Sequence, residues 1–188
     1  MKRINDILIL IIGVLLFLTS YVFDQQVSLF FKNIRFTFFD AFLGIVTNFG
    51  IVILLMLLVP SFIFYNKNKK LVYLLFLTFI VSFILAFVIK LIVLRQRPTE
   101  SFTFPFVNII DYSFPSMHSM VAFSLLPILI KYAPKHKYFW LVFAFLVSFS
   151  RLYFRFHFLS DVLFGALFGY LIGIYLIDLY ENGKLWKK

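Results

Sequence analysis

Long apolar runs alternate with short polar segments along the whole chain. An α-helix rises about 1.5 Å per residue, so about 20 mostly apolar residues are needed to cross the hydrocarbon core of a bilayer. Six segments come close to this length, at residues 7–23, 41–65, 71–94, 115–133, 138–156 and 158–177. The fifth does so only if Arg151 and Arg155 lie in its last turns. The pattern predicts an all-α integral membrane protein, a bundle of six transmembrane helices.

The segment between the first two predicted spans has a helical pattern of its own. Its apolar residues recur at helical spacing, while Lys32 and Arg35 fall elsewhere on the turn. The apolar positions are Val27, Phe30, Phe31, Ile34 and Phe38. This pattern predicts either an interfacial amphipathic helix between helices 1 and 2, lying on the bilayer, or a plain loop.

The composition agrees with a membrane protein. Of the 188 residues, 63% are hydrophobic and only 14% are charged, whereas a soluble domain carries about 25% charged residues. No Pro-, Ser- or Gly-rich linker divides the chain, so we expect a single domain over residues 1–188. Because the chain contains no cysteine, disulfides, thiolate metal sites and a cysteine nucleophile are excluded.

The basic residues predict how the chain is oriented in the cell membrane. Eleven of the 18 Lys and Arg residues lie at the N-terminus, in the 66–70 and 131–137 loops and in the C-terminal tail, and six lie in the three opposite loops. The positive-inside rule therefore predicts that both termini are cytoplasmic. The net charge of +10 is dispersed at the ends of apolar runs. The expected partner is therefore the lipid bilayer and not a nucleic acid.

The last predicted helix contains a stripe of small residues. Gly165, Gly169 and Gly173 recur every four residues, a pattern that allows membrane helices to approach each other closely. The same spacing continued toward the N-terminus reaches Asp161 and then His157. If the helix begins early enough, we expect both side chains to face the interior of the bundle rather than lipid.

Polar and ionisable side chains gather near the predicted non-cytoplasmic face. They are Lys90, Arg97, Ser116, His118, Arg151, His157 and Asp161. Lys90 and Arg97 are two helical turns apart and share one face if the third helix continues to Arg97. Pro115 can start a helix whose first N–H groups point toward an anion.

Each of these residues has an ordinary explanation when it is taken alone. Lys90 can reach the membrane interface, His118 can be a structural histidine, and Asp161 can cap the sixth helix. We interpret Arg95 as such a boundary charge and His136 as such a structural histidine. An ionisable group inside a membrane costs about 2.5–3.5 kcal/mol, however, so a cluster of them indicates a functional site.

The cluster has the groups that phosphate chemistry needs. Several cations beside N–H donors suit an anion with many oxygens, and the arginine fork fits phosphate in particular. His157 precedes Asp161 by four residues, which on a helix describes an imidazole with one nitrogen held and the other available. The second histidine, His118, can supply a proton. Phosphate binding, a nucleophile and a general acid are therefore all present.

The spacing of these residues resembles the three-part signature of the type 2 phosphatidic acid phosphatase family of membrane lipid phosphatases. The stretch KLIVLRQRP matches Lys-x6-Arg-Pro at residues 90–98, and PSMH resembles Pro-Ser-Gly-His at residues 115–118. SRLYFRFHFLSD matches Ser-Arg-x5-His-x3-Asp at residues 150–161. The three motifs occur in this order within residues 90–161, while the N-terminal spans match only in being hydrophobic.

The resemblance implies a role for each matched residue. His157 attacks phosphorus and forms a phosphohistidine, Asp161 orients it, and His118 protonates the leaving lipid alkoxide. The groups implied to bind the phosphoryl oxygens are Lys90, Arg97, Ser116, Arg151 and the backbone near Met117. Water then hydrolyses the intermediate, and no metal or cofactor is implied.

One matched position departs from the family pattern. Met117 stands where the family has glycine, a residue that permits close backbone approach and unusual dihedral angles. The family pattern therefore does not predict the backbone conformation around Met117, although no group that performs chemistry is lost.

The residues leave several functions open. The motifs bind phosphate rather than the tail, so phosphatidic acid, phosphatidylglycerophosphate and a polyprenyl diphosphate such as undecaprenyl diphosphate all fit as lipid substrates. A lipid phosphotransferase would use the same residues. An anion channel or transporter explains the cations but not the pairing of His157 with Asp161, and a metal-dependent hydrolase lacks a compact ligand motif. The oligomeric state cannot be predicted.

Overall fold

The computed structural model describes residues 2–34, 36–99 and 112–186, with side chains from Leu10 onward. Its helices are α1 (Lys2–Asn33), α2 (Thr37–Val46), α3 (Phe49–Ile53), α4 (Val59–Tyr65), α5 (Lys69–Val93), α6 (Met117–Tyr132), α7 (Lys137–Tyr153) and α8 (Leu159–Glu181). A π-helical turn, η1 (Leu54–Leu58), joins α3 to α4, and a 3-10 turn, η2 (Pro134–His136), precedes α7. The described part of the chain contains no strand, which confirms the predicted all-α class.

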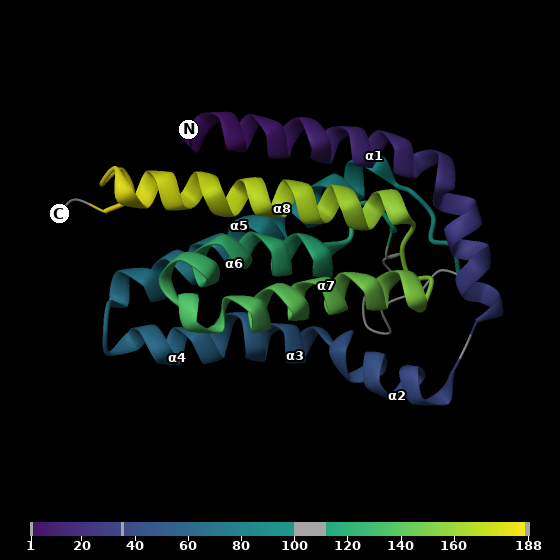
Figure 1. The fold of residues 1–188 in the computed structure, drawn as a ribbon, viewed down its shortest axis with the longest axis horizontal. Helices are drawn as coiled ribbons and strands as arrows, with labels where there is room; N and C mark the ends of the chain where they lie inside the picture. The colour runs from purple at the N-terminus through teal and green to yellow at the C-terminus, as the bar shows by residue number, and fades with distance from the viewer. Residues whose placement is uncertain (1, 35, 100–111, 187–188) are drawn as a thin grey trace.

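The helices form a bundle with α6 near its centre. Most of them lie side by side along one common direction, whereas the C-terminal part of α1 bends across one end of the bundle; the start of α1 and the end of α8 lie at the opposite end (Figure 1). α6 packs against α5, α7 and α8 and contacts α8 most extensively. Most of its side chains between Ser119 and Leu129 are buried, as expected for a helix that is apolar on all sides.

The glycine stripe of α8 lies directly on α6, as predicted. Gly165, Gly169 and Gly173 face, in this order, the backbone carbonyls of Ser116, Met120 and Ser124. A Cβ atom on Gly165 would lie only 2.7 Å from the Ser116 carbonyl oxygen. The missing side chains therefore allow the two backbones to touch, as in other membrane helix pairs with small residues at their interface.

The apolar surface of the bundle is consistent with a membrane protein. Three helical segments are long and apolar enough to cross a bilayer, Leu10–Asn33, α5 and α8. Thr37–Val46 and Phe49–Tyr65, which meet at a bend of 53°, pass the same test as a pair. α6 and α7, at 16 and 17 residues, are shorter than a typical span. Each predicted span overlaps a helix, and the number of six spans stays a prediction.

Several helix ends differ from the prediction. α1 continues to Asn33 and so takes up much of the segment predicted to lie on the bilayer surface, and Phe38 lies in α2. α5 ends at Val93, because Leu94 adopts a left-handed backbone with φ 53°. Lys90 and Arg97 therefore do not share a helix face. α8 begins at Leu159, so His157 lies before the helix rather than on it.

Candidate active site

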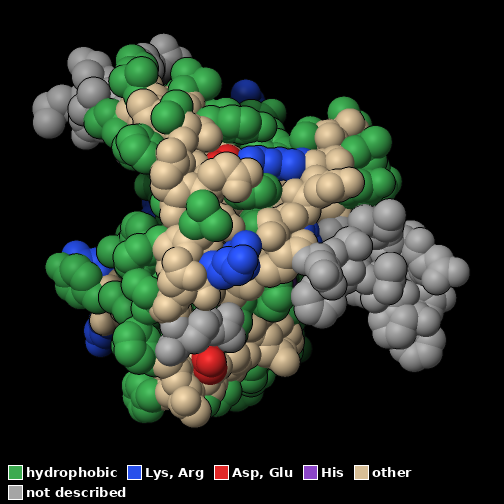
Figure 2. All heavy atoms as spheres, turned by 90° about the vertical axis from the view of Figure 1, so that its right-hand side faces the viewer, with side chains coloured by type: hydrophobic (Ala, Val, Ile, Leu, Met, Phe, Trp, Pro, Cys, Tyr) green, Lys and Arg blue, Asp and Glu red, His purple; other side chains and the backbone are tan. Residues whose placement is uncertain are grey.

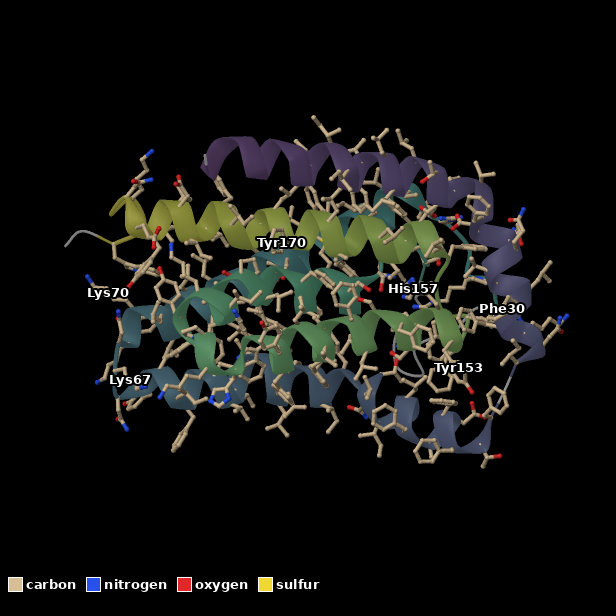
Figure 3. All side chains as sticks on the ribbon, in the orientation of Figure 1. Phe30, Lys67, Lys70, Tyr153, His157 and Tyr170 are labelled. Carbon is tan, nitrogen blue, oxygen red and sulfur yellow. The ribbon has the colours of Figure 1, made fainter. Side chains whose placement is uncertain are left out.

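The side chains that were singled out in the sequence meet at one end of the bundle. His157 lies at this end, while Lys67 and Lys70 lie at the other (Figure 3). Lys and Arg side chains lie in the middle of this end face, with hydrophobic side chains around them (Figure 2). Three connecting segments come together here, residues 94–99 after α5, 112–116 before α6, and 154–158 between α7 and α8.

A tight turn between α7 and α8 buries His157. The backbone N–H groups of Phe156 and His157 both donate to the Arg151 carbonyl, at 3.0 and 3.3 Å. Within this turn Arg155 adopts a left-handed backbone with φ 57°, which reverses the direction of the chain. The turn leaves His157 only 3% exposed.

His157 and Asp161 are neighbours, as the sequence predicted, although only Asp161 belongs to the helix. The Nδ1 atom of His157 lies 3.7 Å from Oδ2 of Asp161, slightly beyond a hydrogen bond. The same oxygen accepts the Phe158 N–H at 2.8 Å and the Ser113 hydroxyl. These two donors hold the carboxylate in place, with Nδ1 toward Asp161 and Nε2 on the opposite side of the ring.

The surroundings of His157 favour its neutral form. Burial lowers the pKa of His157 well below its usual value, and the positive charges of Lys90, Arg97 and Arg151 lower it further, while the Ser113 backbone acts weakly in the opposite direction. An imidazole with a lowered pKa is neutral at neutral pH. Neutral imidazole is the form in which a ring nitrogen can attack phosphorus.

Three cations predicted to bind phosphate lie around His157. The ammonium group of Lys90, which is 5% exposed, donates to the backbone carbonyl of Tyr112. Arg97 donates to the carbonyl of Phe156 at 2.9 Å. The guanidinium carbons of Arg97 and Arg151 lie 5.9 and 4.6 Å from the centre of the Phe156 ring. The three positive charges therefore come from three different segments and meet beside one imidazole.

The N-terminus of α6 is joined to the start of α8. Ser116 is the N-cap of α6, and its backbone N–H donates to the carbonyl of Asp161 at 3.1 Å. Met117 is the first residue of α6 and is half-buried. A methionine adopts helical backbone readily, so this position does not depend on the conformational freedom of glycine.

His118 lies in the first turn of α6, close to the same cations. Its imidazole makes an edge contact with the Phe49 ring at 4.7 Å between centroids, and the positive charges of Arg151 and Arg97 act on it. Arg151 in turn donates to the Thr47 hydroxyl at 2.6 Å. The break between α2 and α3 therefore supports both residues, and the structure brings the two predicted histidines to one site.

The prediction that Arg95 is an ordinary boundary charge was wrong. Its guanidinium donates to Asp161 at 2.6 Å and to Asp24 of α1 at 2.7 Å. It also lies over the Phe158 ring at 4.1 Å and the Tyr21 ring at 4.8 Å. The left-handed residue that ends α5 changes the chain direction just before Arg95, and a helical extrapolation from the sequence could not anticipate this.

Asp24 was also missed, although the sequence contains a signal for it. Asp24 is 3% exposed and accepts the backbone N–H and the hydroxyl of Ser160, at 2.8 and 2.6 Å. Ser20 and Ser28, four residues to either side on α1, are also buried, and Ser28 accepts from Arg155 at 3.2 Å. A polar residue every fourth position at the end of an apolar run indicates a face turned toward protein.

His136 is exposed in η2 and lies away from the site, and its interpretation as a structural histidine stays a prediction. Among the residues that the structure describes, no three His, Asp or Glu side chains are arranged to share a metal ion.

The chain is similar in fold to two solved structures. The first is the transmembrane PAP2 type phosphatidylglycerolphosphate phosphatase from Bacillus subtilis, with a TM-score of 0.73 and 24% identity over 94% of this chain and 96% of that one. The second is Aquifex aeolicus LpxE, with a TM-score of 0.61 and 24% identity over 82% of this chain and 94% of that one.

The family is shown by the sequence itself. No curated protein matches the chain. The model of the PAP2 superfamily, however, matches residues 70–184, more than half of the chain and the part that contains all three motifs. The family model thus covers α5 to α8, and the chain belongs to the PAP2 superfamily of membrane phosphatases.

Proposed function

We propose that this protein is an integral membrane lipid phosphatase that removes a phosphate from a lipid phosphate or diphosphate through a phosphohistidine intermediate. The observation that carries the proposal is the convergence of Lys90, Arg97 and Arg151 on the buried imidazole of His157. The family and the Bacillus subtilis neighbour support a phosphatase.

The first chemical step forms the phosphoenzyme. Nε2 of His157 attacks phosphorus, and a nitrogen–phosphorus bond forms as the bond from phosphorus to the lipid oxygen breaks. Asp161 stabilises the positive charge that develops on the imidazole. His118 donates a proton to the departing alkoxide, so that the lipid leaves as a neutral alcohol.

The second step returns the enzyme to its starting state. His118, now neutral, accepts a proton from water, and the hydroxide attacks phosphorus and displaces Nε2. Inorganic phosphate leaves. The Ser116 hydroxyl and the N–H groups at the start of α6 assist the three cations in holding the phosphoryl oxygens through both steps. The protein's groups account for each proton and bond in this cycle, so the reaction is proposed to need no metal.

The identity of the lipid is left open by the site. Phosphatidic acid, phosphatidylglycerophosphate and a polyprenyl diphosphate share the phosphate that the cations bind. The Bacillus subtilis neighbour is named for phosphatidylglycerolphosphate. A phosphotransferase, in which another hydroxyl replaces water in the second step, is the competing proposal, because it would use the same groups.

Phosphate release from a panel of lipids tests the proposal. The purified protein should release phosphate from at least one of the three lipid classes, and a strong chelator should leave the rate unchanged. Vanadate, which adopts the five-coordinate geometry of the transition state, should inhibit. Phosphate transfer to an added alcohol with little free phosphate would favour the phosphotransferase. Anion flux without hydrolysis would favour a transporter.

A further inference from the structure

The strongest unexplained feature of the site is a charged chain that runs from α1 to the residue behind the nucleophile. Asp24, Arg95 and Asp161 form it through two ion pairs of 2.7 and 2.6 Å. Asp24 and Asp161 are 3% and 0% exposed. Neither Asp24 nor Arg95 is one of the residues that the three-part signature defines. Two carboxylates buried this deeply need a cation between them.

The two carboxylate oxygens of Asp161 have different partners. Oδ1 accepts from Arg95 at 2.6 Å, and Oδ2 lies 3.7 Å from Nδ1 of His157. Arg95 therefore binds Oδ1 on the side of the carboxylate away from His157, while Oδ2 faces the imidazole. Arg95 also donates to Ser160 at 2.7 Å, so it fixes both the side chain and the helix turn that presents it.

Arg95 is itself held by α1. Asp24 accepts from Arg95 through Oδ2 and from the Ser160 backbone through Oδ1, at 2.7 and 2.8 Å. The rings of Tyr21, also on α1, and Phe158 lie against the guanidinium. Both terminal nitrogens of the guanidinium group are hydrogen-bonded to carboxylates, and aromatic rings pack against the group. Arg95 therefore has little freedom to move.

We infer that Arg95, anchored by Asp24, is a positioning residue that holds Asp161 in the orientation in which it aligns the imidazole of His157. The inference rests on the proposed phosphatase function. It also gives a function to α1, which lies outside the matched residues 70–184. Arg95 keeps the negative charge of Asp161 in place, and the phosphate-binding cations do not depend on it.

The test uses two arginines that both tether α1 to the site. Arg155 donates to Ser28 of α1 and to the Pro98 carbonyl, at 3.2 Å each, and among the described residues it forms no hydrogen bond or ion pair with Asp161. Arg95→Gln should lower kcat on the order of 10–100-fold, as expected when a nucleophile is misaligned. KM and vanadate inhibition should change little. Arg155→Gln should keep kcat within about 3-fold of the original protein, since it removes contacts to α1 and to the Pro98 carbonyl but leaves the ion pair of Arg95 with Asp161 intact.

Two further variants distinguish positioning from general support of the fold. Arg95→Lys keeps the charge and loses the fork, so it should recover part of the lost kcat. Asp24→Asn should lower kcat less than Arg95→Gln. It should add little in the Arg95→Gln background, because Asp24 acts through Arg95. Equal losses in Arg95→Gln and Arg155→Gln, with equal losses of thermal stability, would overturn the inference.

Nitrogen-15 NMR of histidine-labelled protein gives a readout that does not need turnover. The chain has three histidines, so the His157 signal can be assigned from its loss in His157→Ala. We expect a proton on Nδ1 in the original protein and in Arg155→Gln, and a mixture of tautomers in Arg95→Gln. An unchanged tautomer in Arg95→Gln overturns the positioning role even if hydrolysis is observed. If the original protein hydrolyses no lipid phosphate, the proposed function fails, whereas the tautomer comparison still decides whether Arg95 holds Asp161 against His157.

Discussion

The two ends of the bundle carry the same kinds of basic side chain in opposite environments. At the end where α4 meets α5, Lys67 and Lys70 are exposed and point away from the bundle (Figure 3). At the other end Lys90 and Arg151 are 5% and 6% exposed. Residue type therefore says little about function in this chain, and burial distinguishes the two ends.

The exposed end looks like a membrane interface. Lys131 pairs with Glu181, and both side chains are more than one-third exposed, so the pair contributes about 0–1 kcal/mol. Lys69 lies over the Tyr65 ring at 5.0 Å. Tyrosine and lysine are the residues that anchor helices at the level of lipid headgroups. The cations of this end stabilise the placement of the protein, whereas those of the other end surround a histidine.

The largest effect on turnover is expected from a comparison of two histidine replacements, one at each end of the bundle. His157→Ala removes the proposed nucleophile, so no phosphoenzyme should form and turnover should fall by at least about 10⁴-fold. His136→Ala, at an exposed position in η2, should leave turnover unchanged. The measurements are phosphate release and trapping of radiolabelled phosphoenzyme. Labelled phosphoenzyme in His157→Ala would assign the nucleophile to another residue.

The two aspartates of α8 allow the next comparison. Asp161→Asn can leave the attacking nitrogen protonated, so kcat should fall on the order of 10²–10⁴-fold, as judged from the serine-protease triad. Asp178→Asn, exposed near the other end of the same helix, should have no effect on kcat. Asparagine is nearly as good a helix cap as aspartate. Near-normal turnover of Asp161→Asn with normal stability would therefore show that Asp161 only caps α8 and does not orient His157.

His118 should show a loss that depends on the leaving group. His118→Ala removes the proposed acid, which contributes about 10²–10⁴-fold with a lipid alkoxide. A nitrophenyl phosphate has a good leaving group and needs no proton, so its loss should be much smaller. Both rates can be measured on the same preparation. Losses of equal size on the two substrates would show that His118 is not the acid.

The smallest change in activity is expected for two single-cysteine variants. They report on which side of the membrane each end of the bundle lies. The chain has no cysteine, and Asn33 and Asn66 are exposed at the ends of α1 and α4. In intact cells, an impermeant thiol reagent should label Asn33→Cys, near the His157 end. Asn66→Cys should react only after the membrane is permeabilised. The reverse labelling would place the site in the cytoplasm. Both variants should keep normal phosphatase activity.

Site residues could be predicted from the sequence where the chemical type of a residue alone restricts the environment in which it can lie. The seven polar or ionisable candidates could be selected because polar and charged groups are costly in apolar runs, and all of them lie at the same end of the bundle. Arg95 could not, because its direction depends on the left-handed Leu94 that ends α5. Asp24 was missed although Ser20, Asp24 and Ser28 are spaced four residues apart, because the predicted first span ended one residue before Asp24, whereas α1 continues past it to Asn33.

The backbone contact between α6 and α8 also limits how a lipid can enter. Two helices whose backbones touch at three successive turns cannot slide or rotate past each other without a clash, so α6 and α8 are expected to move as one rigid body. The acid on α6 and the carboxylate on α8 would then keep their separation throughout the cycle. Any opening wide enough for a headgroup is expected at a looser joint. We expect this opening at the bend of 53° between α2 and α3, beside Thr47.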